Sequence, residues 1–73
     1  MVTEPEIITR YKKEENFYIE QLKVVEDKKQ RRFFSKSLKM LHELKAKYLN
    51  NDIELEAFDE QLTRIEKGIL PID

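Results

Sequence analysis

Few side chains in this 73-residue sequence could take part in catalysis or bind a metal ion. The chain has no cysteine and a single histidine, His42, so it offers no thiolate nucleophile and no pair of histidines for a helical zinc or di-iron site. Acidic residues adjoin one another at 14–15, 26–27 and 59–60, but consecutive helical residues point about 100° apart and do not converge on one substrate atom. We therefore expect no enzymatic activity, no cofactor and no metal site.

The charges are segregated along the chain. The sequence has 14 Lys and Arg against 15 Asp and Glu. Residues 1–27 carry an excess of three negative charges, residues 28–47 an excess of seven positive charges, and residues 48–73 an excess of five negative charges. If residues 28–47 form a helix, six basic side chains share the face opposite its apolar residues. This basic face consists of Lys28, Lys29, Arg32, Lys36, Lys39 and Lys47.

Two interpretations of the basic face remain open. Acidic flanks of neighbouring helices could pair with it inside the fold, or it could bind an acidic protein, the phosphates of a nucleic acid or an anionic membrane surface. Nucleic acid is less favoured, because the face has no interleaved aromatic residues and no glycine marks a helix-turn-helix. Membrane insertion is not expected, because no run of 18 apolar residues occurs.

The elements that would carry these residues are helices. The only glycine is Gly68 and the prolines are Pro5 and Pro71, so helix breakers stand almost entirely at the ends of the chain. We predict an all-α fold, a small antiparallel three-helix bundle or a helical hairpin with a third helix, as one domain over 1–73. The expected helices span about 4–26, 28–49 and 53–67, followed by a tail at 68–73.

Capping patterns set these boundaries. Thr3 and Glu6 predict a capping box in which the Thr3 side chain accepts from first-turn amides, and Asp27 with Gln30 predicts a second one. A tight connection near residues 26–28 is favoured over one continuous helix, because the apolar stripe shifts its register there. Residues 50–52, Asn-Asn-Asp, predict the break before the third helix.

Apolar residues at helical spacing predict the core. From the first, second and third helices, in that order, the predicted core residues are Ile7, Ile8, Tyr11, Tyr18, Ile19, Leu22, Val25, Phe34, Leu38, Leu41, Leu44, Tyr48, Leu55, Phe58, Leu62, Ile65 and Ile69. Phe17 and Val24 lie off this stripe, so they contact either the third helix or a partner. Phe33 and Met40 border it. These four residues, with the apolar tail at 69–72, are candidates for a partner surface.

A local resemblance covers residues 38–65. It rests on leucines in the second helix, a break, and then an isoleucine, a glutamate and a phenylalanine, namely Leu41, Leu44, Ile53, Glu56 and Phe58. This pattern resembles short C-terminal helical-hairpin modules of the SHOCT type. The chain departs from that pattern at Asn51, where the family has glycine, and at Glu54, where Ser or Thr is usual. The resemblance implies an interaction or oligomerisation element.

The sequence therefore favours a non-enzymatic protein-protein interaction module, such as an adaptor, an inhibitor or a regulatory subunit. Its binding surface would comprise the basic face together with Phe17, Val24, Phe33 and Met40. The absence of cysteine and of a signal-peptide pattern at the N-terminus predicts a cytoplasmic location. Because so short a chain buries a small core, self-association is expected as a further source of stability. The alternative is nucleic-acid binding through Lys28, Arg32, Lys36 and Lys39.

Overall fold

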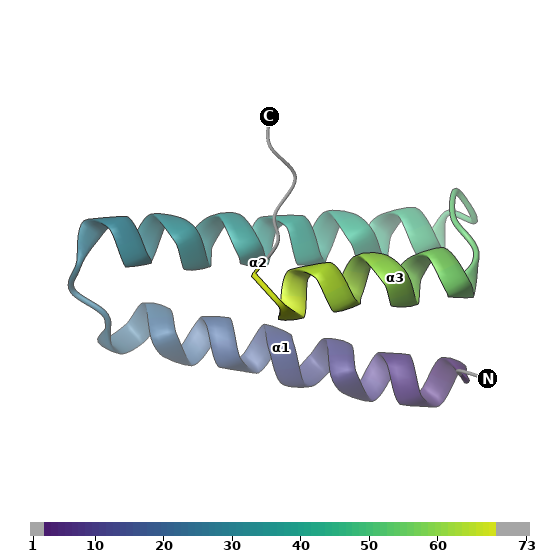
Figure 1. The fold of residues 1–73 in the computed structure, drawn as a ribbon, viewed down its shortest axis with the longest axis horizontal. Helices are drawn as coiled ribbons and strands as arrows, with labels where there is room; N and C mark the ends of the chain where they lie inside the picture. Colours follow the sequence, from purple (N-terminus) through teal and green to yellow (C-terminus); the bar gives the residue numbers. More distant parts are fainter. Residues whose placement is uncertain (1–2, 69–73) are drawn as a thin grey trace.

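The computed structural model describes residues 3–68 and folds them into three helices, α1 (Glu4–Val24), α2 (Lys28–Leu49) and α3 (Leu55–Glu66). α1 and α2 form a long antiparallel hairpin, and α3 turns back to pack against both of them (Figure 1). No strand occurs within the described residues. The prediction of an all-α three-helix fold is confirmed, whereas the tail at 69–73 lies outside the described residues.

Two helix boundaries differ from the predicted ones. α1 ends at Val24 rather than near residue 26, because Val25 is extended, with φ −78° and ψ 128°. The Arg31 guanidinium donates to the Leu22 and Val25 carbonyls at 2.7 and 2.8 Å, which satisfies backbone acceptors at the end of α1. α3 begins at Leu55 rather than Ile53. α1 and α2 are thus separate helices joined by a tight connection.

The two predicted caps differ in outcome. Asp27 Oδ1 accepts from the Lys29 amide at 3.3 Å, so Asp27 is a side-chain cap of α2 as expected. Thr3 occupies the N-cap position of α1, but its side chain makes no capping hydrogen bond, and that prediction was wrong. The reason is local: Pro5 is the second residue of the helix and has no N–H, which removes one of the two amides that a cap normally serves.

Asn51 and Gly68 end their helices in the left-handed region. Asn51 has φ 63° and Gly68 has φ 77°, the conformation that Asn tolerates better than most residues and that Gly adopts without strain. The polar break at 50–52 and the glycine stop were both predicted for this reason. A reversal at Asn51 sends α3 back along the hairpin.

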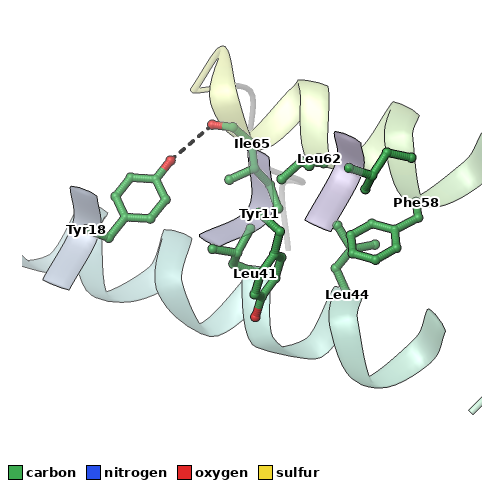
Figure 2. Packing of buried hydrophobic residues seen from close by; sticks show 8 residues of the cluster. Tyr11, Tyr18, Leu41, Leu44, Phe58, Leu62 and Ile65 are labelled. Carbon is green, nitrogen blue, oxygen red and sulfur yellow. Dashed lines mark hydrogen bonds between the residues drawn. The ribbon is translucent and has the colours of Figure 1, made fainter. Parts of the chain in front are cut away.

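The core gathers eight buried apolar side chains from the three helices (Figure 2). They are Ile7, Tyr11, Tyr18, Leu41, Leu44, Phe58, Leu62 and Ile65. The Phe58 ring is fully buried between Tyr11 and Tyr48, with ring centroids 6.2 and 4.8 Å away. Ile19, predicted as core, is exposed, because it points about 100° away from Tyr18 and falls outside the contact.

α3 is too short to cover the whole hairpin. It has 12 residues against 21 in α1 and 22 in α2, or about 18 Å of helix against about 32 Å. It ends level with Tyr18, whose hydroxyl donates to the Ile65 carbonyl at 3.2 Å (Figure 2). Within residues 3–68, the half of the hairpin nearest the α1–α2 connection therefore has no third helix over it (Figure 1).

Candidate functional site

The basic face of α2 points away from the core. Lys28, Lys29, Arg32, Lys39 and Lys47 are all exposed, and none of the ion pairs formed within residues 3–68 involves these five side chains. Lys36 lies on the same face. Five of the six basic side chains thus keep their charge available to a ligand as far as the described chain is concerned.

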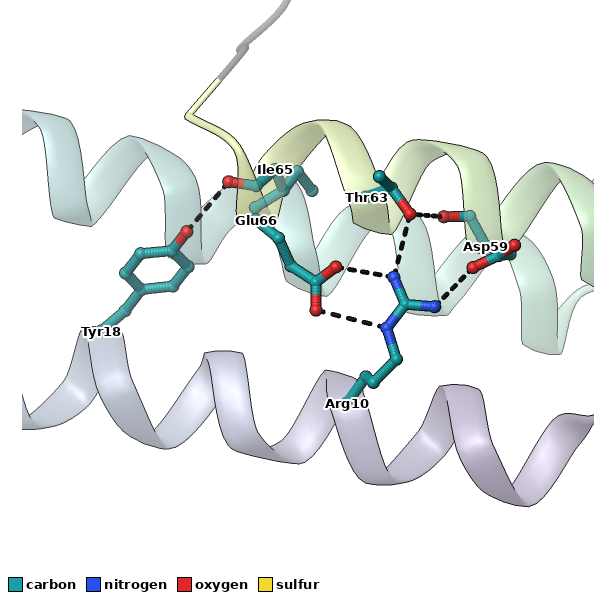
Figure 3. Close-up of polar contacts among 6 residues, drawn as sticks. All are labelled: Arg10, Tyr18, Asp59, Thr63, Ile65 and Glu66. Atoms are coloured by element: carbon teal, nitrogen blue, oxygen red, sulfur yellow. Dashed lines mark hydrogen bonds and ion pairs between the residues drawn. The ribbon is translucent and has the colours of Figure 1, made fainter. Parts of the chain in front are cut away.

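The carboxylates of α3 pair with α1 instead. Arg10 of α1 reaches across to Asp59, Thr63 and Glu66 on α3 (Figure 3). Its Nη2 lies 2.6 Å from Glu66 Oε1 and 2.9 Å from Thr63 Oγ1. The hydrogen bonds that Arg10 donates to Glu66 and Asp59 raise the pKa of Arg10 further above its ordinary value, so the guanidinium stays charged. This Arg10 cluster therefore occupies two of the acids that could have neutralised α2.

We expect the Arg10 cluster to contribute measurably to stability. Arg10→Gln leaves Asp59 and Glu66 without their cation, and for a partly exposed network we expect a loss of about 1–2 kcal/mol, or roughly 5–15 °C in Tm. Arg64→Gln is the matched control, because Arg64 forms only an exposed 3.8 Å pair with Glu60 on its own helix. Thermal unfolding, monitored by circular dichroism, gives the Tm of both variants. Equal shifts for the two variants would contradict this role for Arg10.

A groove of about 460 Å³ separates α2 from α3 on the side away from α1. Its apolar floor consists of Met40, Leu44, Ile53, Ala57 and Ile65. The α2 rim carries Lys36, Lys39, Glu43 and Lys47, whereas the α3 rim is formed by the uncharged Gln61. Chemically, the groove combines an apolar floor with a predominantly positive edge.

A second apolar surface lies at the end of α3, and we call its residues Phe17, Val24 and Phe33 the distal patch. The Phe17 and Phe33 rings each lie against Phe34, with centroids 6.1 and 5.6 Å away, and they line a shallow pocket of about 350 Å³ with Gly68. Val24 is two helical turns beyond Phe17 on the same side of α1. The three side chains are 48%, 71% and 40% exposed, in the order of their numbers.

The sequence-predicted binding residues therefore fall into three groups. Lys36, Lys39 and Met40 meet in the α2–α3 groove. Phe17 and Phe33 meet in the pocket beyond α3, where Phe17 touches Tyr18 and Phe34. Lys28, Lys29 and Arg32 lie on the first two turns of α2. The α3 wall of the groove was not predicted from the sequence. Ala57 and Gln61 could have indicated it, because residues four apart lie on the same face of a helix, here next to Phe58.

His42 lies within hydrogen-bond distance of a carboxylate on α1. Its Nε2 lies 2.8 Å from Glu15 Oε2 on α1, and the Tyr11 hydroxyl donates to the same carboxylate oxygen at 3.4 Å. The contact joins α1 to α2 at the surface. Across residues 3–68 no cluster of three or more His, Cys, Asp or Glu side chains is arranged to hold a metal ion.

None of the helices formed by the described residues is both long enough and apolar enough to cross a membrane. Comparison with known proteins finds no matching family model, no matching curated protein and no matching solved structure. The resemblance of residues 38–65 to SHOCT-type modules stays a prediction.

Proposed function

We propose that this chain is a non-enzymatic interaction module that binds an acidic amphipathic helix of a partner protein in the α2–α3 groove. The observation that carries the proposal is the pairing of an apolar floor with a lysine edge in one groove. An amphipathic helix recognised in a groove buries apolar side chains at 3–4 spacing and places charged residues on either side. Acidic residues on the flank that faces α2 would meet Lys39 and Lys47.

The internal charge arrangement supports this choice of partner. The ion pairs of Asp59 and Glu66 are made to Arg10 on α1, and Lys39 and Lys47 have no ion pair within residues 3–68. A partner carboxylate would therefore meet these lysines without displacing an acid of the same fold. The groove's residues also overlap the segment 38–65 that resembles an interaction module. A cytoplasmic location is part of the same proposal.

A helical probe peptide tests the groove directly. A helical peptide of about 14 residues, with leucines at 3–4 spacing and glutamates on the flank that faces α2, is about 20 Å long and so covers the roughly 17 Å between Lys36 and Lys47. We expect binding of the peptide, monitored by backbone NMR, to change the chemical shifts of Met40, Ile53, Ala57 and Gln61. Reversing charge at Lys39 and Lys47 to Glu should weaken binding about tenfold.

Matched controls accompany the peptide. Reversing Lys12 and Lys13, which are exposed on α1, makes the same change in net charge and should leave the affinity almost unchanged. Equal weakening by the two double reversals would mean a nonspecific charge effect and would overturn the groove assignment. Tight, salt-dependent binding of duplex DNA or RNA, lost on reversing Lys28 and Arg32, would favour the nucleic-acid alternative instead.

A further inference from the structure

We propose that the distal patch is a self-association surface, on which a second copy of this chain packs hairpin against hairpin. A two-fold axis running along the hairpin would place α1 of one copy over α2 of the other, with both connections at the same end. This contact lies at and beyond the end of α3, whereas the predicted peptide groove runs along α3, and it goes beyond the function proposed above.

The first reason is the missing length of α3. Past the level of Glu66, α1 and α2 continue for about two turns toward their connection, and within residues 3–68 no third helix lies alongside these turns (Figure 1). Phe17, Val24 and Phe33 are three of the five large apolar side chains exposed within residues 3–68. Phe17 and Phe33 lie together at the end of α3 and Val24 lies two turns beyond Phe17, whereas isolated exposed apolar residues need no explanation.

The second reason is that the patch has an acidic edge on α1 and a basic edge on α2, so two copies can pair opposite charges. From residue 14 to residue 27 the chain carries five acids and one lysine, whereas from residue 28 to residue 32 it carries four basic residues and no acid. Stacking α1 on α1 would oppose like charges. The proposed axis instead sets the acidic edge of each copy against the basic edge of the other, twice, as an isologous dimer requires.

This arrangement predicts one particular ion pair between the two copies. Glu20 lies one turn beyond Phe17 toward the connection, and Lys29 lies one turn beyond Phe33 in the same direction. Glu20 is exposed and pairs only loosely with Lys23, at 3.4 Å. With the axis along the hairpin, Glu20 of one copy faces Lys29 of the other. A second copy fits this edge better than an all-acidic partner, which would meet the carboxylates of α1.

The first test compares Val24→Glu with Leu49→Glu. Val24 is the last residue of α1 and 71% exposed, and Leu49 is the last residue of α2 and 64% exposed, so the two substitutions should perturb the monomer equally. Sedimentation equilibrium from about 10 µM to about 1 mM covers the range in which small interfaces dissociate. We expect a dimer in the native chain, a dimer in the Leu49 variant, and at least about tenfold weaker association in the Val24 variant.

The second test exchanges charges. Glu20→Lys alone and Lys29→Glu alone should each weaken their own homodimer, because each places like charges in both cross-contacts. Mixing the two variants should restore dimerisation, because both cross-contacts then join opposite charges. Recovery of the dimer in the mixture alone is the expected signature.

Several outcomes would overturn the proposal. The first is that the native chain stays monomeric at the highest concentration. The second is that Val24→Glu and Leu49→Glu weaken the dimer equally. The third is that mixing the Glu20→Lys and Lys29→Glu variants does not restore dimerisation. Reversal of Lys39 and Lys47, which should weaken the predicted peptide binding about tenfold, should leave the dimer intact. Self-association and groove binding can therefore fail independently.

Discussion

Phe58→Ala should abolish most of the stability of the fold. The Phe58 side chain is 0% exposed and its ring packs against both Tyr11 and Tyr48. Truncating a fully buried phenylalanine costs about 3–5 kcal/mol, because the transfer free energy is lost and a cavity is left behind. A domain of this size is stable by only about 4–11 kcal/mol, so we expect Tm to fall by about 15–30 °C or cooperative unfolding to disappear.

The same substitution at Phe33 is the control. Phe33 is 40% exposed and contacts the ring of Phe34 at the margin of the bundle, so its truncation should cost less than about 1 kcal/mol. Both variants are compared by thermal unfolding at a concentration where the chain is monomeric. If Phe33→Ala destabilised the monomer as strongly as Phe58→Ala, the distal patch would be core rather than surface.

The helices and most of the core were predictable because both depend on local pattern. The seam through Phe58, Leu62 and Ile65 recurs at helical spacing, and the polar break before it contains Asn51, which tolerates the left-handed turn. Periodicity was less reliable at the margin of a stripe. The apolar pattern placed Ile19 in the core, but the Ile19 side chain is exposed. Spacing alone does not say how wide a strip of one helix its neighbours cover.

The candidate sites were predictable only in part, because they depend on how the helices align. Helix length could be estimated from Gly68, but the exposure of Phe17 and Phe33 follows from where α3 ends relative to the hairpin. The basic face was readable from charge spacing. That Lys28, Lys29, Arg32, Lys39 and Lys47 form no ion pair within residues 3–68 was not readable, because it depends on how the helices align. Arg10, for example, pairs with Asp59 and Glu66, which are 49 and 56 residues away in the sequence.

Alkaline pH should destabilise the fold through Tyr11 and Tyr18. Burial, followed by the negative charge of Glu15 for Tyr11 and by a hydrogen bond with Glu14 for Tyr18, raises the pKa of each tyrosine to about 12. The unfolded chain titrates near pH 10, so above that pH it loses these protons while the native state still holds them. The stabilisation is therefore complete below pH 10 and is lost as pH rises toward 12, by about 1.4 kcal/mol for each tyrosine at pH 11.

The double variant Tyr11→Phe, Tyr18→Phe isolates this effect, because lysines deprotonate over the same range in both proteins. Its free energy of unfolding in urea, relative to the native chain, should rise by about 2.7 kcal/mol between pH 8 and pH 11. The single variants then compare two places in the bundle. Tyr11 packs on Phe58 under α3, whereas the Tyr18 hydroxyl donates a hydrogen bond to the Ile65 carbonyl in the last turn of α3. A Tyr18→Phe variant that kept the full alkaline loss would mean that α3 does not enclose Tyr18, and that the uncovered half of the hairpin begins one turn earlier.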